Sequence, residues 1–171
     1  MNYFDFYGLP VKFNLNVQGL KAKYLAYLKL NHPDFFVNDA SKYQDALDKT
    51  SLNNEAYLCL ANDSLRANYI LKLSGYEFDE KLPSDFLMEM MELNEMLEDV
   101  KYTASVEQIK ALETNILGYI DTLSSEFSKL CTEADTANKD HKLLLSTIKV
   151  NLLKNKYLLR LKETLANIAP Q

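Results

Sequence analysis

The tripeptide His32-Pro33-Asp34 separates two helical stretches of sequence and decides how they are joined. An ordinary turn between helices uses Gly, Asn or Ser, whose backbones adapt to many angles. Pro33 instead fixes its own φ, removes a backbone donor and pushes His32 towards an extended conformation. An imidazole and a carboxylate are therefore expected at a rigid corner. Taken alone, the tripeptide is most simply a helix stop at His32, with Asp34 shaping the turn.

An amphipathic helix is expected on each side of this corner. The first covers residues 16–31, because its apolar side chains recur at the three- and four-residue spacing of one helical face. Lys23 and Lys29 fall on its opposite side. The second covers residues 41–61, with Ala46, Thr50, Tyr57 and Leu60 as its inner face. Joined through the corner, the two helices make an antiparallel hairpin.

The remaining sequence completes an all-α chain of two modules. Shorter helices are expected at residues 3–7, closed by Gly8, and at the stretch that ends at Gly75. Three longer helices follow, with short connections that favour an antiparallel three-helix bundle. They are expected at residues 84–100, from Ser105 onward and at 136–167. The last helix is expected to be apolar on a broad face, with one side formed by Leu145, Ile148, Leu152 and Leu159 and another by Val150, Tyr157, Leu161 and Leu165. The expected organisation is a first module at 1–75, a linker at 76–83 and a second module at 84–171.

Composition and charge limit the classes of function. The 171 residues are 47% apolar, enough for a folded core, and carry a net charge of −5. Residues 1–75 hold eight Lys/Arg against seven Asp/Glu, a balance of +1; residues 76–171 hold eleven against seventeen, a balance of −6. An acidic second half without a basic stripe argues against nucleic-acid binding and suggests two modules with different protein partners.

The sequence also bears on location and redox state. Cys59 and Cys131 stand far apart in sequence and outside any ligand-spaced motif, so free thiols in a reducing compartment are expected. No stretch approaches the roughly 18 to 20 apolar residues of a membrane span, and the first residues lack a signal-peptide pattern. A cytoplasmic protein without membrane association is expected.

The helix at residues 84–100 carries more apolar residues than one buried face needs. At 100° per residue, a sufficient core face is formed by five of them. These are Phe86, Met90, Leu93, Leu97 and Val100. Leu87, Met88 and Met91 point well away from this face and are interleaved with carboxylates. Either a neighbouring helix covers this second face, or it is a protein-binding patch, for which methionine is well suited.

Enzymatic and metal chemistry find little support. His32 and Asp34 flank a proline and are not expected to orient each other as an acid–base pair. No phosphate loop, nucleophile elbow or paired-carboxylate motif occurs. A metal site would require Cys59, Cys131, His32 and His141 to converge from four separate places. No enzyme, cofactor or metal site is therefore expected.

Several motifs together resemble one family. They are Tyr3-Phe4, Gly8-Leu9-Pro10, His32-Pro33-Asp34, Asn54-Glu55-Ala56-Tyr57, Arg66-Ala67-Asn68-Tyr69 and Asp85-Phe86-Leu87-Met88-Glu89. On these residues the first module resembles a J-domain and the whole chain resembles the HscB family, the J-domain co-chaperones of iron–sulfur cluster biogenesis. Asn53 departs from the resemblance, since the family usually has an apolar residue there. The absence of a cysteine-rich N-terminal extension favours the bacterial type.

The resemblance implies a function and two sets of site residues. His32, Pro33 and Asp34 would dock on an HscA- or DnaK-type chaperone and stimulate its ATPase, with Lys23 and Lys29 steering the approach. The second module would receive the cluster scaffold IscU. The residues implied there are Leu87, Met88, Met91, Glu92, Glu95, Asp99 and Leu152. A J-domain protein that delivers another client is the main rival, because the first module supports both versions equally.

Overall fold

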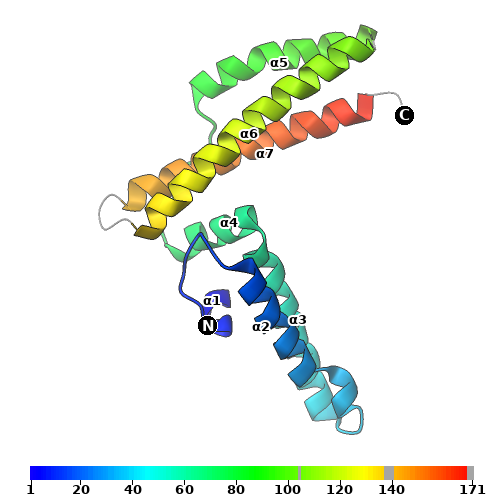
Figure 1. Cartoon of the computed structure of the whole chain (residues 1–171), viewed down its shortest axis with the longest axis vertical. Coiled ribbons are helices and arrows are strands. Elements are labelled where there is room, and N and C mark those ends of the chain that lie inside the picture. Colours follow the sequence, from blue (N-terminus) through cyan, green and yellow to red (C-terminus); the bar gives the residue numbers. More distant parts are fainter. Residues whose placement is uncertain (104, 137–140, 169–171) are drawn as a thin grey trace. The chain divides into compact units, whose positions relative to one another are not determined.

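The chain is helical and divides into two compact units. The computed structural model describes residues 1–103, 105–136 and 141–168, and among these it contains helices and no strand (Figure 1). The units are Met1–Gly75 and Tyr76–Gln171. The all-α fold expected from the sequence is confirmed. Residues 76–83, expected as a linker, belong to the second unit.

Unit 1 is built from four α-helices and a 3-10 turn. The helices are α1 (Tyr3–Tyr7), α2 (Val17–Leu30), α3 (Ala40–Ala61) and α4 (Asp63–Leu73). The turn η1 (Pro33–Phe36) joins α2 to α3. Gly8 closes α1 with a φ of 60°, a left-handed conformation that glycine adopts without a Cβ penalty. The hairpin of α2 and α3 thus matches the expectation, with a connection over residues 31–39 where 32–40 was expected.

The buried face of α3 differs from the expected one. Ala46 and Leu60 are buried as expected, but Asn53 and Ala56 replace Thr50 and Tyr57, which are half-buried. The ring of Tyr57 stacks on that of Tyr24 with centroids 4.3 Å apart. This stack lies at the edge of the hairpin, so a helical spacing alone did not distinguish it from the core.

Asn53 is fully buried because its polar atoms find partners in two neighbouring elements. The Tyr7 hydroxyl contacts both the Asn53 Oδ1 atom at 2.7 Å and the Asn53 carbonyl oxygen at 3.0 Å. The Asn53 Nδ2 atom donates to the Tyr24 carbonyl oxygen at 3.2 Å. Burial raises the pKa of Tyr7, so its hydroxyl stays protonated. A polar residue at this position therefore connects α1, α2 and α3.

Arg66 explains why an arginine opens the Arg-Ala-x-Tyr motif. Its side chain is buried, and its Nε atom donates to the Phe13 carbonyl oxygen at 2.7 Å. Its Nη1 atom donates to the carbonyl oxygen of Leu60 near the end of α3, and its Nη2 atom pairs with Asp63. The planar guanidinium thereby ties α4 to the loop before α2 and to the end of α3, which a lysine could not do with one ammonium.

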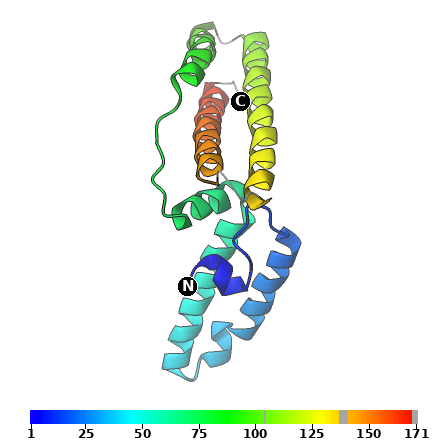
Figure 2. The ribbon, with the colours of Figure 1, turned by 90° about the vertical axis from the view of Figure 1, so that its left-hand side faces the viewer.

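Unit 2 is a bundle of three long helices. They are α5 (Ser84–Thr103), α6 (Val106–Thr136) and α7 (His141–Ile168), and all three pairs are in contact. Figures 1 and 2 show α6 and α7 running alongside each other. The predicted core face of α5 is confirmed, since all five of its residues are buried against α6 and α7. Thr136 ends α6, whereas the sequence placed it at the start of the last helix.

The buried side of α7 needs one correction. Leu159 is 44% exposed, and Leu158 takes the core position instead. Leu145 and Ile148 are buried as predicted, and so is Leu161. The polar residue Asn151 is also buried and donates through Nδ2 to the Leu123 carbonyl oxygen of α6 at 3.1 Å. A helix that packs on two neighbours has a broad apolar face, so its edges are hard to place from spacing alone.

The segment before α5 packs on unit 2. The Lys142 ammonium lies over the Tyr76 ring, 5.4 Å from its centroid. Glu80 pairs with Lys149 at 2.5 Å, and Leu82 packs against the bundle core. These contacts fix the segment on α7 and place the start of α5.

Candidate functional site

The candidate chaperone-binding site is the corner between α2 and α3. His32 has φ −67° and ψ 128°, the extended conformation that Pro33 was expected to impose. Pro33 occupies the first position of η1, where its missing N–H costs nothing. The side chains of His32 and Asp34 are 51% and 80% exposed. Both polar groups are thus displayed to solvent on a backbone that cannot relax easily.

His32 and Asp34 contact each other across Pro33. The Asp34 backbone N–H donates to His32 Nδ1 at 3.3 Å, and Nδ1 lies 3.5 Å from Asp34 Oδ2. A neutral imidazole that accepts at Nδ1 carries its proton on Nε2. The imidazole therefore caps the 3-10 turn and holds the Asp34 backbone.

The two candidate lysines lie on the exposed side of α2. Lys23 and Lys29 are both exposed, and neither forms an ion pair with another described residue. Lys29 lies three residues before His32, while Lys23 is two helical turns from the corner. The hairpin therefore places positive charge next to the tripeptide and further along the same helix.

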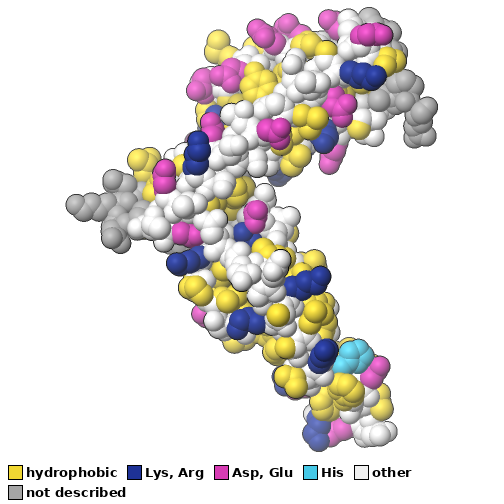
Figure 3. All heavy atoms as spheres, in the orientation of Figure 1, with side chains coloured by type: hydrophobic (Ala, Val, Ile, Leu, Met, Phe, Trp, Pro, Cys, Tyr) yellow, Lys and Arg dark blue, Asp and Glu magenta, His cyan; other side chains and the backbone are white. Residues whose placement is uncertain are grey.

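The corner also displays apolar side chains that the sequence reasoning did not single out. Leu30, Phe35 and Val37 are 75%, 69% and 63% exposed. Figure 3 shows hydrophobic atoms gathered around the histidine at this end of the hairpin. Counting the large apolar residues near the tripeptide that do not fit the helical spacing would have identified these three side chains.

The second candidate site is the outward face of α5, here called the α5 patch and defined as Leu87, Met88 and Met91. These side chains are 43%, 69% and 58% exposed, so no neighbouring helix of the bundle covers them. The carboxylates of Glu92, Glu95 and Asp99 are exposed along the same helix. Of the two alternatives from the sequence, an apolar patch edged by acidic groups is the one found.

Leu152 does not lie on this surface. Its side chain is buried, at 8% exposed, because α7 turns this position into the bundle. The burial of Leu152 corrects its assignment as a scaffold contact. The resemblance implied Leu152 as a contact, but apolar residues occupy many positions of the last helix, so sequence spacing does not show which of them face solvent.

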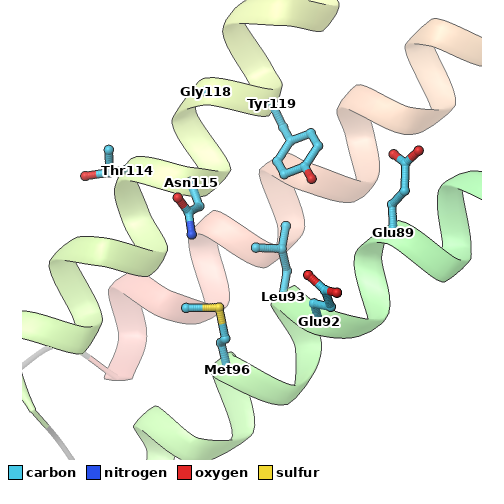
Figure 4. A pocket seen from close by; sticks show the side chains of 8 residues that line it. All are labelled: Glu89, Glu92, Leu93, Met96, Thr114, Asn115, Gly118 and Tyr119. Carbon is cyan, nitrogen blue, oxygen red and sulfur yellow. The ribbon is translucent and has the colours of Figure 1, made fainter.

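A groove between α5 and α6 adjoins the α5 patch. It encloses about 410 Å³ and is lined on α5 by Glu89, Glu92, Leu93 and Met96, and on α6 by Thr114, Asn115, Gly118 and Tyr119 (Figure 4). Glu92 therefore belongs to both the acidic edge of the patch and the wall of the groove. The α6 residues of this groove were also missed, because their spacing marks only a polar helix face.

Other kinds of site find no counterpart in the described part of the chain. No group of three or more His, Cys, Asp or Glu side chains there is placed to hold a metal ion. No helix among the described residues is both long and apolar enough to cross a bilayer. Cys59 is partly buried, which raises the pKa of its thiol, and Cys131 is buried; neither cysteine forms a disulfide.

Comparison with known proteins identifies the chain. Residues 82–166 match the family model described as the HSCB C-terminal oligomerisation domain. A co-chaperone protein HscB homolog from Colwellia psychrerythraea is 35% identical over 135 residues, 76% of this chain and 74% of the relative. The iron–sulfur cluster co-chaperone protein HscB of Mus musculus is 34% identical over 75% of this chain and 57% of its own length.

A solved structure extends the similarity to nearly the whole chain. Chaperone HscB from Vibrio cholerae matches with a TM-score of 0.73 and 27% identity, covering 98% of this chain and 97% of that protein. The matched relatives define the class of protein, a co-chaperone, which acts together with a chaperone partner. This chain belongs to the HscB co-chaperone family. The resemblance read from the sequence motifs is confirmed.

Proposed function

We propose that this chain serves iron–sulfur cluster assembly by bringing the scaffold protein IscU to an HscA- or DnaK-type chaperone. Unit 1 stimulates the ATPase of the chaperone, and unit 2 binds the scaffold. The observation that carries the proposal is the α5 patch: three large apolar side chains exposed on a bundle helix, in a chain that also displays His32-Pro33-Asp34.

At the chaperone, the corner acts through preorganised charge. Asp34 is exposed on a backbone held by Pro33 and by the His32 cap, so little conformational freedom is lost on docking. Its carboxylate is suited to a charge-assisted hydrogen bond with an arginine of the chaperone. Lys23 and Lys29 then steer the hairpin towards an acidic surface and raise the association rate.

In scaffold binding, the α5 patch supplies the apolar contact area, and the neighbouring carboxylates orient the scaffold. Leu87, Met88 and Met91 would be buried on binding, and methionine adapts its shape to the partner. Glu92, Glu95 and Asp99 would form the polar rim, which contributes more to specificity and rate than to affinity. Leu152 is buried within unit 2 and is not proposed as a contact.

A different client protein is the second candidate function. The exposed apolar groups of the α5 patch would also suit another folded protein, and nothing in unit 1 distinguishes the two versions. The Mus musculus relative, which is named an iron–sulfur cluster co-chaperone, favours the scaffold.

Direct binding separates these candidates. Isothermal titration of the purified chain with IscU, and with an unrelated folded protein as a control client, measures both affinities under one condition. Saturable binding of IscU together with stimulation of the chaperone ATPase is the expected result. ATPase stimulation without binding of IscU would favour the other client.

A further inference from the structure

The groove between α5 and α6 is a site of which the proposed contacts of unit 2 include only one residue, Glu92. Its floor is apolar, formed by the buried Leu93 and the half-buried Met96. Its walls are polar, and no Lys or Arg lines it. Figure 4 shows Glu89 and Glu92 on α5 facing Asn115 and Tyr119 on α6 across the gap.

The polar groups of the walls are not engaged within the bundle. Neither Glu89 nor Glu92 pairs with a cationic side chain of the described chain, and the Asn115 amide and the Tyr119 hydroxyl form no hydrogen bond with another described residue. In contrast, the Thr114 hydroxyl donates a hydrogen bond to the Lys110 carbonyl oxygen at 2.8 Å. Two carboxylates, an amide and a phenol ring therefore face one space with their binding capacity free.

Gly118 lines the groove on its α6 side. It lies in the interior of α6, where glycine destabilises a helix relative to alanine by about 1 kcal/mol. Its φ is not in the left-handed region, and a Cβ placed there would meet no atom within 4 Å. Neither backbone conformation nor packing in the bundle requires a glycine here. What its missing side chain does is keep the groove open.

We propose that the groove receives a basic side chain, an arginine or a lysine, from the protein that binds the α5 patch. The proposal rests on scaffold binding by unit 2 and extends that surface from α5 onto α6. Continuity supports it, because Glu92 borders both the patch and the groove. Charge supports it too: the groove presents two carboxylates and no cation, and the Tyr119 ring offers a face for a cation–π contact.

Filling the groove is the sharpest test. In Gly118→Leu the new side chain occupies the space that the basic group needs, while leucine favours the helix more than glycine does. The expected result is at least five-fold weaker binding of purified IscU, measured by isothermal titration, with a melting temperature equal to or above that of the unchanged chain. A residue with a purely structural role would not gain stability and lose binding together.

Ser125→Leu is the matched control. Ser125 is exposed on α6 two helical turns beyond Gly118 and does not line the groove. The same leucine at this position should raise helix stability without changing the affinity for IscU. A loss of affinity in Ser125→Leu equal to that in Gly118→Leu would overturn the proposal, because it would show an effect of surface leucines in general.

Glu89→Gln tests the charge without filling the groove or disturbing the fold. Loss of one exposed ion pair should weaken IscU binding by about three- to five-fold and reduce its dependence on salt. The basic residues of IscU are then changed to alanine one at a time. Titration of each IscU variant with the unchanged chain and with Glu89→Gln identifies the inserted side chain. Its removal should weaken binding to the unchanged chain and have little further effect in Glu89→Gln.

The outcomes separate the groove from the function on which it depends. If Gly118→Leu and Glu89→Gln bind IscU as tightly as the unchanged chain, while changes in the α5 patch weaken binding, the groove proposal is wrong and scaffold binding stands. If the unchanged chain does not bind IscU, the proposed function fails and the groove proposal fails with it. If Gly118→Leu lowers the melting temperature, Glu89→Gln alone decides.

Discussion

Single residues of unit 1 combine local hydrogen bonding with long-range contacts, and Asn53 is the clearest case. It lies on a helix face that the sequence assigns to the core, where an apolar residue is the usual choice. Its side chain is fully buried and bonded to the Tyr7 hydroxyl and the Tyr24 carbonyl oxygen, so it satisfies polar groups of two other helices. Burial is tolerated because each polar atom has a partner.

Truncation of Asn53 should therefore cost more than a typical surface change. Asn53→Ala removes both hydrogen bonds and leaves a small cavity, so the free energy of unfolding should fall by about 2 to 3 kcal/mol in urea denaturation. Tyr7→Phe removes only the hydroxyl and should cost about 1 kcal/mol. A loss below 0.5 kcal/mol, on the order of an ordinary surface substitution, in Asn53→Ala would show that these bonds contribute little.

For substitutions in the corner tripeptide we expect the opposite, a large functional effect with little change in stability. His32→Gln or Asp34→Asn should abolish stimulation of the chaperone ATPase, because each alters the preorganised polar group at the corner. Both side chains are largely exposed, so the melting temperature and IscU binding should be retained. Unchanged stimulation in both variants, measured in a single-turnover ATPase assay, would refute a role for the corner.

Among the elements, α5 shows most clearly how a helix can serve two purposes. Its five buried residues repeat at helical spacing and attach it to α6 and α7. Between them, Leu87, Met88 and Met91 face solvent, which a helix needed only for packing would avoid. The two faces have different tasks, and substitutions should separate them.

The double change Leu87→Ala and Met91→Ala should weaken IscU binding several-fold or more at little cost in stability. Both side chains are about half exposed, so their truncation leaves no cavity in the bundle. Met90→Ala is the matched control on the buried face: it is fully buried, and its truncation should lower the free energy of unfolding by about 2 to 5 kcal/mol. If the double change lowers stability as much as Met90→Ala does, the patch is part of the core.

The sequence predicted this element better than others because its signal is periodic. The core face of α5, the capping of α1 by Gly8 and the extended His32 all follow from local rules and are found in the structure. Three other features do not follow from local rules: the contact between His32 and Asp34, the burial of Leu152 and the groove between α5 and α6. Each depends on a turn geometry or on helix packing that sequence spacing does not encode. The same limit placed Leu159 in the core in place of Leu158.

In the whole molecule, two units with different charge are joined in one chain. Unit 1 carries a balance of +1 and unit 2 a balance of −6, and each displays its own apolar surface. Covalent linkage raises the effective concentration of a scaffold bound to unit 2 near a chaperone bound to unit 1. The proposed function therefore requires both units in one molecule and predicts more than the sum of their separate effects.

The single-turnover ATPase rate of an HscA-type chaperone, with this chain and IscU added separately and together, tests this claim most directly. The account predicts synergy: the rate with both present exceeds the sum of the two separate stimulations, and the excess disappears in Asp34→Asn and in the Leu87→Ala, Met91→Ala double variant. Rates that merely add, or an excess that survives in either variant, would contradict it.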